Sequence, residues 1–128
     1  MILDTSAVVA VVRREEGAAR LLVKMSRAES LAIGAPTLVE ATVVLGRRFG
    51  SAGLESLDRF LEEEQVTLIP FGQRHWRAAR SAFIRFGKGR HPASLNFGDC
   101  MTYATASITG QPLLFTGNDF AQTDIPPA

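Results

Sequence analysis

The sequence predicts an α/β sandwich built on a mostly parallel sheet. The chain has 128 residues, which fits one domain spanning residues 1–128. Hydrophobic residues make up 46% of the chain, enough to bury a core. Short apolar runs alternate with segments of helical periodicity, and this alternation favours parallel strands joined by helical crossovers.

The N-terminal half begins with a short apolar run, Met1–Leu3, which predicts a buried strand. Thr5 or Ser6 is placed to cap the helix that follows, and Gly17 ends it. The further elements expected in this half are a helix at Ala18–Arg27, a strand at Ser30–Ile33, a helix from Pro36 to Phe49 that ends at Gly50, and an amphipathic helix at Leu54–Glu64.

The C-terminal half continues the alternation. The helix at Gln73–Phe86 is expected to turn Trp76, Ala79 and Phe83 inward, with Arg74, Arg77 and Arg85 on its outer face. The other elements expected here are a strand at Val66–Ile69, a loop at Gly87–Pro92, a helix at Phe97–Thr109 capped by Asn96, and a strand at Leu113–Phe115.

The composition excludes several classes of protein. The single cysteine, Cys100, excludes a disulfide framework and a cysteine-based zinc site. No apolar run approaches the roughly 18 to 20 residues that span a bilayer, and the start of the chain lacks the basic segment of a signal peptide. A cytoplasmic protein with no membrane partner is therefore expected.

The net charge of +1 hides an uneven distribution. The segment from Gln65 to Gly98 holds six Lys and Arg residues and no acid, so its charge of +6 is offset by −5 in the rest of the chain. Such a basic segment fits a solvated helix face or a surface that binds a polyanion.

Four acids stand apart from the other charges, each alone in an uncharged stretch: Asp4, Glu40, Asp99 and Asp119. An acid in apolar surroundings is costly unless it is paired or binds a cation. Eight other acids, among them Glu15, lie in polar or amphipathic surroundings typical of solvated helix faces. The four isolated acids follow or precede predicted strands, and ligand sites gather at the carboxyl ends of parallel strands. We therefore expect them to converge on one edge of the sheet.

Carboxylates packed together repel one another unless a cation lies between them. Mg²⁺ or Mn²⁺ takes such oxygen ligands, activates a water and holds phosphate oxygens, which is the general design of metal-dependent phosphodiester hydrolysis. No phosphate-binding loop or dinucleotide-binding motif competes with this interpretation. Asp124 stands near the end of the chain and is left outside the predicted site.

The segments around these acids resemble the motifs of PIN domains, and most closely those of VapC-type toxins of prokaryotic toxin–antitoxin pairs. A Gly-Lys-Gly-Arg-His loop precedes the third segment, and the resemblance covers nearly the whole chain. The segments are Met1–Ala7 (MILDTSA), Ala35–Glu40 (APTLVE), Leu95–Cys100 (LNFGDC) and Leu114–Phe120 (LFTGNDF).

The resemblance implies a three-layer α/β/α sandwich with strand order 3-2-1-4-5 and a Mg²⁺- or Mn²⁺-dependent endoribonuclease, in which a metal-activated water attacks RNA and leaves 5′-phosphate and 3′-hydroxyl ends. It also implies a homodimer and a hetero-oligomer with a small VapB-like antitoxin. The expected catalytic and metal-binding residues are Asp4, Glu40, Asp99 and Asp119. The expected supporting residues are Thr5, Ser6, Thr116 and Asn118, and the expected RNA-binding residues are Arg85, Lys88, Arg90 and His91.

Two alternatives belong to other classes. The first is a catalytically silent RNA- or protein-binding module on the same fold, which the loss of one of the acids would favour. The second is an aspartyl-phosphate phosphatase or a response regulator, either of which also places an Asp after the first strand. The phosphatase has an Asp two residues beyond its nucleophile, where this chain has Ser6, and the response regulator has its phosphoacceptor after a later strand. All four acids are present, so the sequence favours the nuclease.

Overall fold

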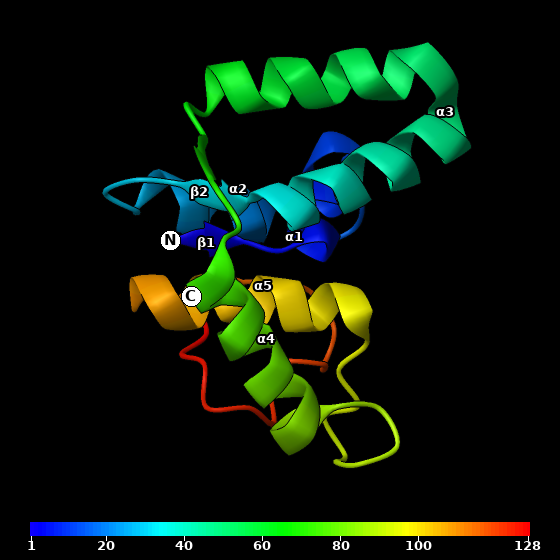
Figure 1. Cartoon of the computed structure of the whole chain (residues 1–128). Helices are drawn as coiled ribbons and strands as arrows, with labels where there is room; N and C mark the ends of the chain where they lie inside the picture. The colour runs from blue at the N-terminus through cyan, green and yellow to red at the C-terminus, as the bar shows by residue number, and fades with distance from the viewer.

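The computed structural model describes residues 1–128 and shows a parallel sheet between two layers of helices (Figure 1). The four strands are β1 (Ile2–Leu3), β2 (Ala32–Gly34), β3 (Thr67–Ile69) and β4 (Leu113–Leu114). They lie in the order β3-β2-β1-β4, and every neighbouring pair is parallel. The predicted fold class is confirmed, as are the first four positions of the predicted strand order.

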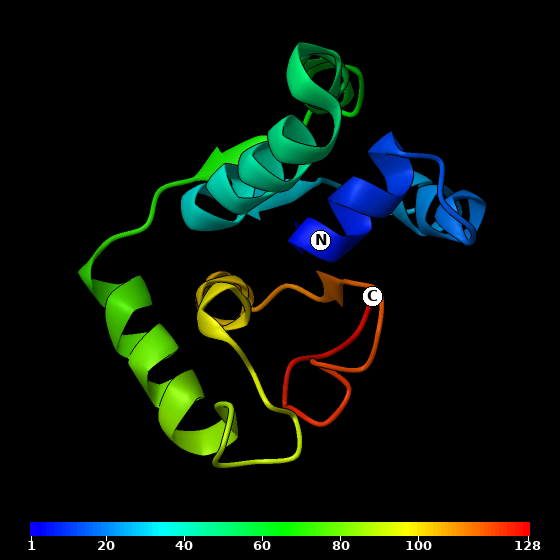
Figure 2. The same ribbon diagram turned by 90° about the vertical axis from the view of Figure 1, so that its right-hand side faces the viewer.

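The helices cover both faces of this sheet, as Figure 2 shows, with α1, α2 and α3 on one side and α4 and α5 on the other. Successive strand residues point to opposite faces, so Leu3 joins the core under α1 and α3 while Ile2 joins the core under α4 and α5. The helices are α1 (Thr5–Val12), α2 (Ala18–Ser26), α3 (Ala35–Glu63), α4 (Gln73–Phe86) and α5 (Phe97–Thr109).

Helix α3 is bent into two limbs at Gly50, where the sequence predicts a break between two helices. Gly50 has φ 60° and ψ −146°, a conformation open essentially to glycine alone. The first limb packs Ala41 and Leu45 against the sheet, and the second packs Leu57 and Phe60 into the same core. No helix of the structure, α3 included, combines the length and apolarity needed to cross a bilayer.

The cap of α1 differs from the prediction. Asp4, rather than Thr5 or Ser6, is the N-cap residue, and its side chain accepts a hydrogen bond from the Ser6 amide. Aspartate is among the preferred capping residues because its carboxylate satisfies a free amide and faces the positive end of the helix dipole.

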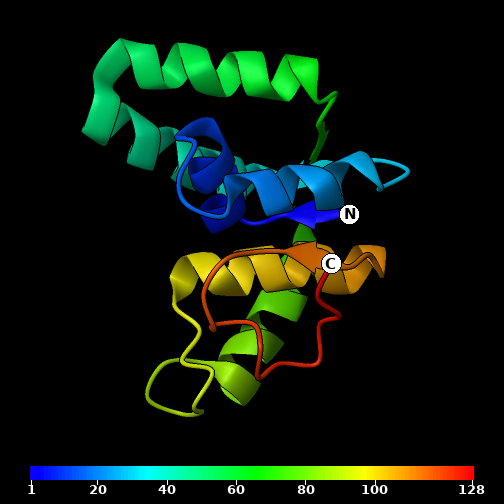
Figure 3. The ribbon, with the colours of Figure 1, turned by 180° about the vertical axis from the view of Figure 1, so that it is seen from behind.

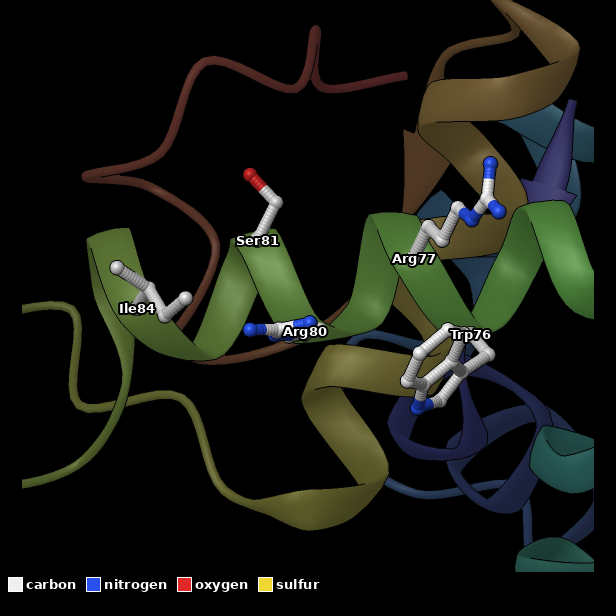
Figure 4. Close-up of a pocket in the computed structure, with 5 residues that line it drawn as sticks. All are labelled: Trp76, Arg77, Arg80, Ser81 and Ile84. Atoms are coloured by element: carbon white, nitrogen blue, oxygen red, sulfur yellow. The ribbon is translucent and has the colours of Figure 1, made fainter.

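The inward face of α4 also differs. Ala79, as predicted, and Phe86 are buried, but Trp76 is 53% exposed and Phe83 is 45% exposed. Figure 4 shows Trp76 and Ile84 on α4, where they line a pocket together with Arg77 and Arg80. Small residues bring α4 close to α5, and three of its larger apolar side chains, Trp76, Phe83 and Ile84, lie at the surface.

The fifth strand of the predicted order is absent as a regular strand. The C-terminal segment runs beside β4 (Figure 3), where a single parallel bridge pairs Leu113 with Pro127. The Leu113 amide donates to the carbonyl of Pro126, and the Ala128 amide donates to the carbonyl of Leu113. Proline has no N–H to extend a hydrogen-bonded ladder, so pairing stops after this one bridge.

Candidate active-site cleft

The four isolated acids meet in one cleft at the carboxyl ends of the strands, as predicted. Asp4 directly follows β1, Glu40 lies in the second turn of α3 after β2, Asp99 lies in the first turn of α5, and Asp119 follows β4. All four line a cleft of about 280 Å³. Thr5, Ser6 and Thr116 line it with them, whereas Asn118 does not.

Asp4 is the most deeply placed of these carboxylates, with 6% of its surface exposed. The amide and hydroxyl of Ser6 both donate to its Oδ2 atom, at 2.9 and 2.5 Å. The Ser6 hydroxyl in turn accepts a hydrogen bond of 3.0 Å from the Thr116 amide. Ser6 therefore connects β1 to the segment after β4, fixes one oxygen of Asp4 and leaves Oδ1 free for a ligand.

Glu40 is oriented from two sides. The Thr5 hydroxyl donates to Oε2 of Glu40 at 2.6 Å and also lies 3.3 Å from the carbonyl of Thr37. On the other side the carboxylate lies against Gly98, where an added Cβ would come within 2.6 Å of Oε1. Gly98 is thus a site residue that the sequence analysis did not identify, and its position directly before Asp99 is the only signal of it in the sequence.

Asp99 combines a capping role with an unusual pKa. It forms a reciprocal capping box with Asn96: the Asn96 amide donates to Oδ2 of Asp99 at 2.8 Å, and the Asp99 amide donates to Oδ1 of Asn96 at 2.9 Å. The pKa of Asp99 is raised to about 6, chiefly by burial; the hydrogen bond from the Asn96 amide opposes this rise, and the charges of Asp4, Asp119 and Glu40 add to it. The other three acids therefore lie close enough to Asp99 to raise its pKa electrostatically.

Two charged residues of the cleft were not predicted. Glu15 lines it, although the sequence placed this residue on a solvated helix face, and Arg48 lines it from α3. Both stand beside a residue of the same charge, Glu16 and Arg47 respectively, so neither is isolated in the sequence.

The donor set of the cleft fits a hard divalent cation. The ionisable groups that line it, apart from Arg48, are all carboxylates, the ligands that Mg²⁺ and Mn²⁺ prefer. No three of them lie close enough together to share one ion by themselves. Mg²⁺ usually takes only one or two carboxylates and keeps several waters, so a closed cage of protein ligands is not required. Charge repulsion acts over longer distances than coordination, which explains why the carboxylates perturb Asp99 without touching.

The residues expected to bind RNA lie outside this cleft. Arg85 donates to Asp124 at 2.7 Å and to the Tyr103 hydroxyl at 3.2 Å. Arg90 stacks over the Phe83 ring. The two remaining members make other contacts: Lys88 lines an apolar groove between α4 and α5, and His91 accepts a hydrogen bond from the Ala93 amide.

Asp124, which lies outside the predicted site, has a structural role. Its Oδ1 atom accepts a hydrogen bond of 2.6 Å from the Tyr103 hydroxyl, and its Oδ2 atom pairs with Arg85. The hydrogen bond from Tyr103 lowers the pKa of Asp124, while burial and this contact raise the pKa of Tyr103 to about 12. The three residues tie the C-terminal segment to α4 and α5.

Comparison with known proteins decides the family. The family model of the PIN domain matches residues 1–126. The chain belongs to the PIN-domain family. Within it, the chain is 48% identical over 126 residues to ribonuclease VapC36 of Mycobacterium tuberculosis, covering 98% of this chain and 91% of that protein. It is 40% identical to ribonuclease VapC of Mycolicibacterium smegmatis, covering 98% and 97% of the two chains.

Solved structures show the same PIN fold at lower sequence identity. VapC20 of Mycobacterium tuberculosis, described as a Sarcin-Ricin loop cleaving toxin, superposes with a TM-score of 0.80 at 15% identity, over 99% of this chain and 97% of that one. VapBC2 from Rickettsia felis, bound to a DNA fragment of its promoter, superposes with a TM-score of 0.73 at 17% identity, over 98% and 94% of the two chains. The resemblance seen in the sequence is confirmed at the level of family and fold.

Proposed function

We propose that this PIN domain is a metal-dependent endoribonuclease and the toxin of a toxin–antitoxin pair. One observation carries the proposal: four carboxylates that are far apart in the sequence line one cleft, in a chain that is 48% identical to a ribonuclease. A binding module without catalysis would have no need to gather so many mutually repelling charges.

The expected ion is Mg²⁺ or Mn²⁺, bound directly by one or two of the carboxylates of Asp4, Glu40, Asp99 and Asp119 and reached by the others through waters. When bound, such an ion lowers the pKa of a coordinated water and stabilises charge on the phosphate. The protein positions the carboxylates: Ser6 fixes Asp4, Thr5 fixes Glu40, and Asn96 fixes Asp99. Thr116 supports Ser6 through its amide.

The proposed partners are an RNA substrate, a small VapB-like antitoxin and a second copy of the chain. Toxin–antitoxin complexes among the structural neighbours support the antitoxin, and the ribonuclease names of the relatives support RNA. Lys88, Arg90 and His91 stay candidates for RNA contacts, whereas Arg85 must first leave its ion pair with Asp124. A cytoplasmic location stays a prediction.

The proposal is tested with the purified chain and a labelled single-stranded RNA. We expect cleavage with Mg²⁺ or Mn²⁺, no cleavage in excess EDTA, and new ends that carry 5′-phosphate and 3′-hydroxyl groups. Asp4→Asn keeps a good helix cap and should lower the rate at least about 100-fold, because charge stabilisation by the ion is worth several kcal/mol. Asp58→Asn removes an exposed acid from α3 outside the cleft and should leave the rate unchanged.

Two outcomes would contradict the proposal. Equal cleavage with and without EDTA would exclude metal dependence. RNA binding that weakens with salt but never leads to cleavage with either ion would instead favour the catalytically silent binding module.

A further inference from the structure

Arg48 is the one cationic side chain that lines the acidic cleft. Five carboxylates line the same cleft, those of Glu15 and the four predicted acids. An RNA strand that enters such a cleft brings more negative charge into it. A bound metal ion can offset the charge of the phosphate that reacts, but the neighbouring phosphates need a cation of their own.

The guanidinium of Arg48 has no partner within the protein. The only ion pair of the structure joins Arg85 to Asp124, so no carboxylate lies within ion-pair distance of Arg48. The adjacent Phe49 ring is covered by Arg13, whose guanidinium lies 3.3 Å from the ring centroid. Arg48 is exposed, and none of these contacts gives it a structural role.

The position of Arg48 on α3 explains why it stays free. Glu40, Val44 and Arg48 follow one another at intervals of four residues, and all three line the cleft. At 1.5 Å per residue, Arg48 lies about 12 Å beyond Glu40 along the helix axis. Helical side chains lean toward the N-terminus, so the guanidinium extends back toward the rim of the cleft without reaching the carboxylates.

We propose that Arg48 binds a backbone phosphate of the RNA that flanks the phosphodiester being cut. This inference rests on the proposed ribonuclease function. Guanidinium presents two N–H donors in the geometry that phosphate oxygens accept, and it keeps its charge at any physiological pH. The contact is made equally in the ground state and in the transition state, so it contributes to substrate binding rather than to the chemical step.

The test compares Arg48→Gln with Arg47→Gln, its neighbour in the chain, which is also exposed but does not line the cleft. The probe is a short labelled single-stranded RNA of random sequence, cleaved with Mg²⁺ at several NaCl concentrations. We expect Arg48→Gln to raise KM about tenfold with kcat within about twofold of wild type, as for loss of one charged hydrogen bond. The salt dependence of kcat/KM should weaken by about 0.7 in logarithmic slope, the value for one phosphate of a single strand. Arg48→Lys should recover part of the affinity, and Arg47→Gln should change KM less than twofold.

The same contact can also be tested by changing the RNA instead of the protein. After the cut is mapped on one RNA, uncharged methylphosphonates replace single phosphates beside it. We expect one replacement to raise KM for wild type and to have no further effect on Arg48→Gln.

The inference is overturned if Arg48→Gln and Arg47→Gln have the same KM, if kcat falls while KM is unchanged, or if no methylphosphonate raises KM. In each case wild type still cleaves RNA, so the proposed function stands. Failure of wild type to cleave RNA with either ion overturns the function and this inference together.

Discussion

The charge of Asp99 is subject to two opposing effects. The start of α5 stabilises its negative charge through the capping box with Asn96 and the helix dipole. Burial and three neighbouring acids oppose that charge and raise its pKa to about 6. An acid whose pKa is raised on folding costs stability once it ionises, so a metal-free cleft is a source of strain that a cation would relieve.

This gives a prediction for Asp99→Asn. The ordinary pKa of an aspartate is about 3.9, so the cost grows as pH rises from about 4 to 6 and is fully present at pH 7. Asparagine keeps the acceptor for the Asn96 amide but removes the charge. Solvent screening reduces this cost. In the absence of metal, we therefore expect Asp99→Asn to be about 1 kcal/mol more stable than wild type at pH 7 and no more stable than wild type at pH 4. We also expect the variant to be inactive. Thermal melts at both pH values check this, and equal stability at pH 7 would contradict it.

Gly98 gives a second prediction at this scale. A Cβ at position 98 would lie within 3 Å of three atoms of the Glu40 carboxyl group, so Gly98→Ala should push that flexible side chain away from Thr5. We expect RNA cleavage to fall about tenfold to 100-fold, the range seen for groups that orient metal ligands, with little loss of stability. Gly72→Ala is the matched control, because a Cβ there meets nothing within 4 Å and φ is −120°. Equal activity of the two variants would exclude a positioning role for Gly98.

The predictable site residues are those whose charge is isolated in the sequence. Asp4, Glu40, Asp99 and Asp119 stand out because each is alone in an uncharged stretch, and their places beside predicted parallel strands predict the cleft. Arg48 lies beside Arg47, so only the folded helix separates the residue inside the cleft from the one outside. Gly98 carries no chemical group, and its role follows only from the close approach of Glu40.

At the scale of elements, the C-terminal segment depends on a contact that the sequence does not reveal. Tyr103 in α5 donates to Asp124, which is 21 residues away. Tyr103→Phe should lower the free energy of unfolding by about 1 kcal/mol at pH 7, the usual worth of one hydrogen bond. Because the pKa of Asp124 is lowered in the folded state, the contribution of its charge is present above about pH 4 and is lost as pH falls through that lowered pKa.

A double-mutant cycle with Asp124→Asn separates this contact from general effects of the substitution. The cost of Tyr103→Phe should shrink in the Asp124→Asn background and at low pH, as measured by denaturant unfolding. A cost that is unchanged in both would show that the hydroxyl acts through some other partner.

Helix α4 shows why the inward face of an element is harder to predict than its existence. Its ends agree with the prediction, yet the row Trp76, Ala79, Phe83 and the row Ala79, Ala82, Phe86 both have helical spacing. The larger side chains favour the first row, but the structure buries the second, because small residues allow α4 to approach α5 closely. Hydrophobic periodicity alone does not show which of two apolar rows on one helix is buried.

At the scale of the whole molecule, the net charge of +1 hides two separated regions of opposite charge. An acid-lined cleft lies at the carboxyl ends of the strands, and all six basic side chains of the Gln65–Gly98 segment lie on α4 and the loop after it. The parallel topology was predictable because alternating strands and helices allow few other arrangements. The absence of a regular fifth strand was not predictable. The strand order expected from the family resemblance takes no account of the two prolines that interrupt this strand.

Binding of a metal ion in the cleft should therefore raise the stability of the whole folded chain. A cation that binds only the folded chain raises stability by about 2.7 kcal/mol at 100 times its Kd. We expect Mn²⁺ to raise Tm at pH 7, to raise it less at pH 5, where Asp99 is protonated, and to have no effect on Asp4→Asn. Thermal melts with and without EDTA measure this. A Tm that responds to Mn²⁺ equally in wild type and Asp4→Asn would place the ion outside the cleft.

The bridge between Leu113 and Pro127 has a consequence for association between molecules. An open sheet edge offers unpaired N–H and C=O groups to which another chain can add a strand, a common route to aggregation. At this edge the inward groups of Pro126 and Ala128 are already bonded to Leu113, and the residue left facing outward is Pro127. Because Pro127 has no N–H to offer, a neighbouring chain finds no backbone donor at this position of the edge, which protects the sheet from continuing into another molecule.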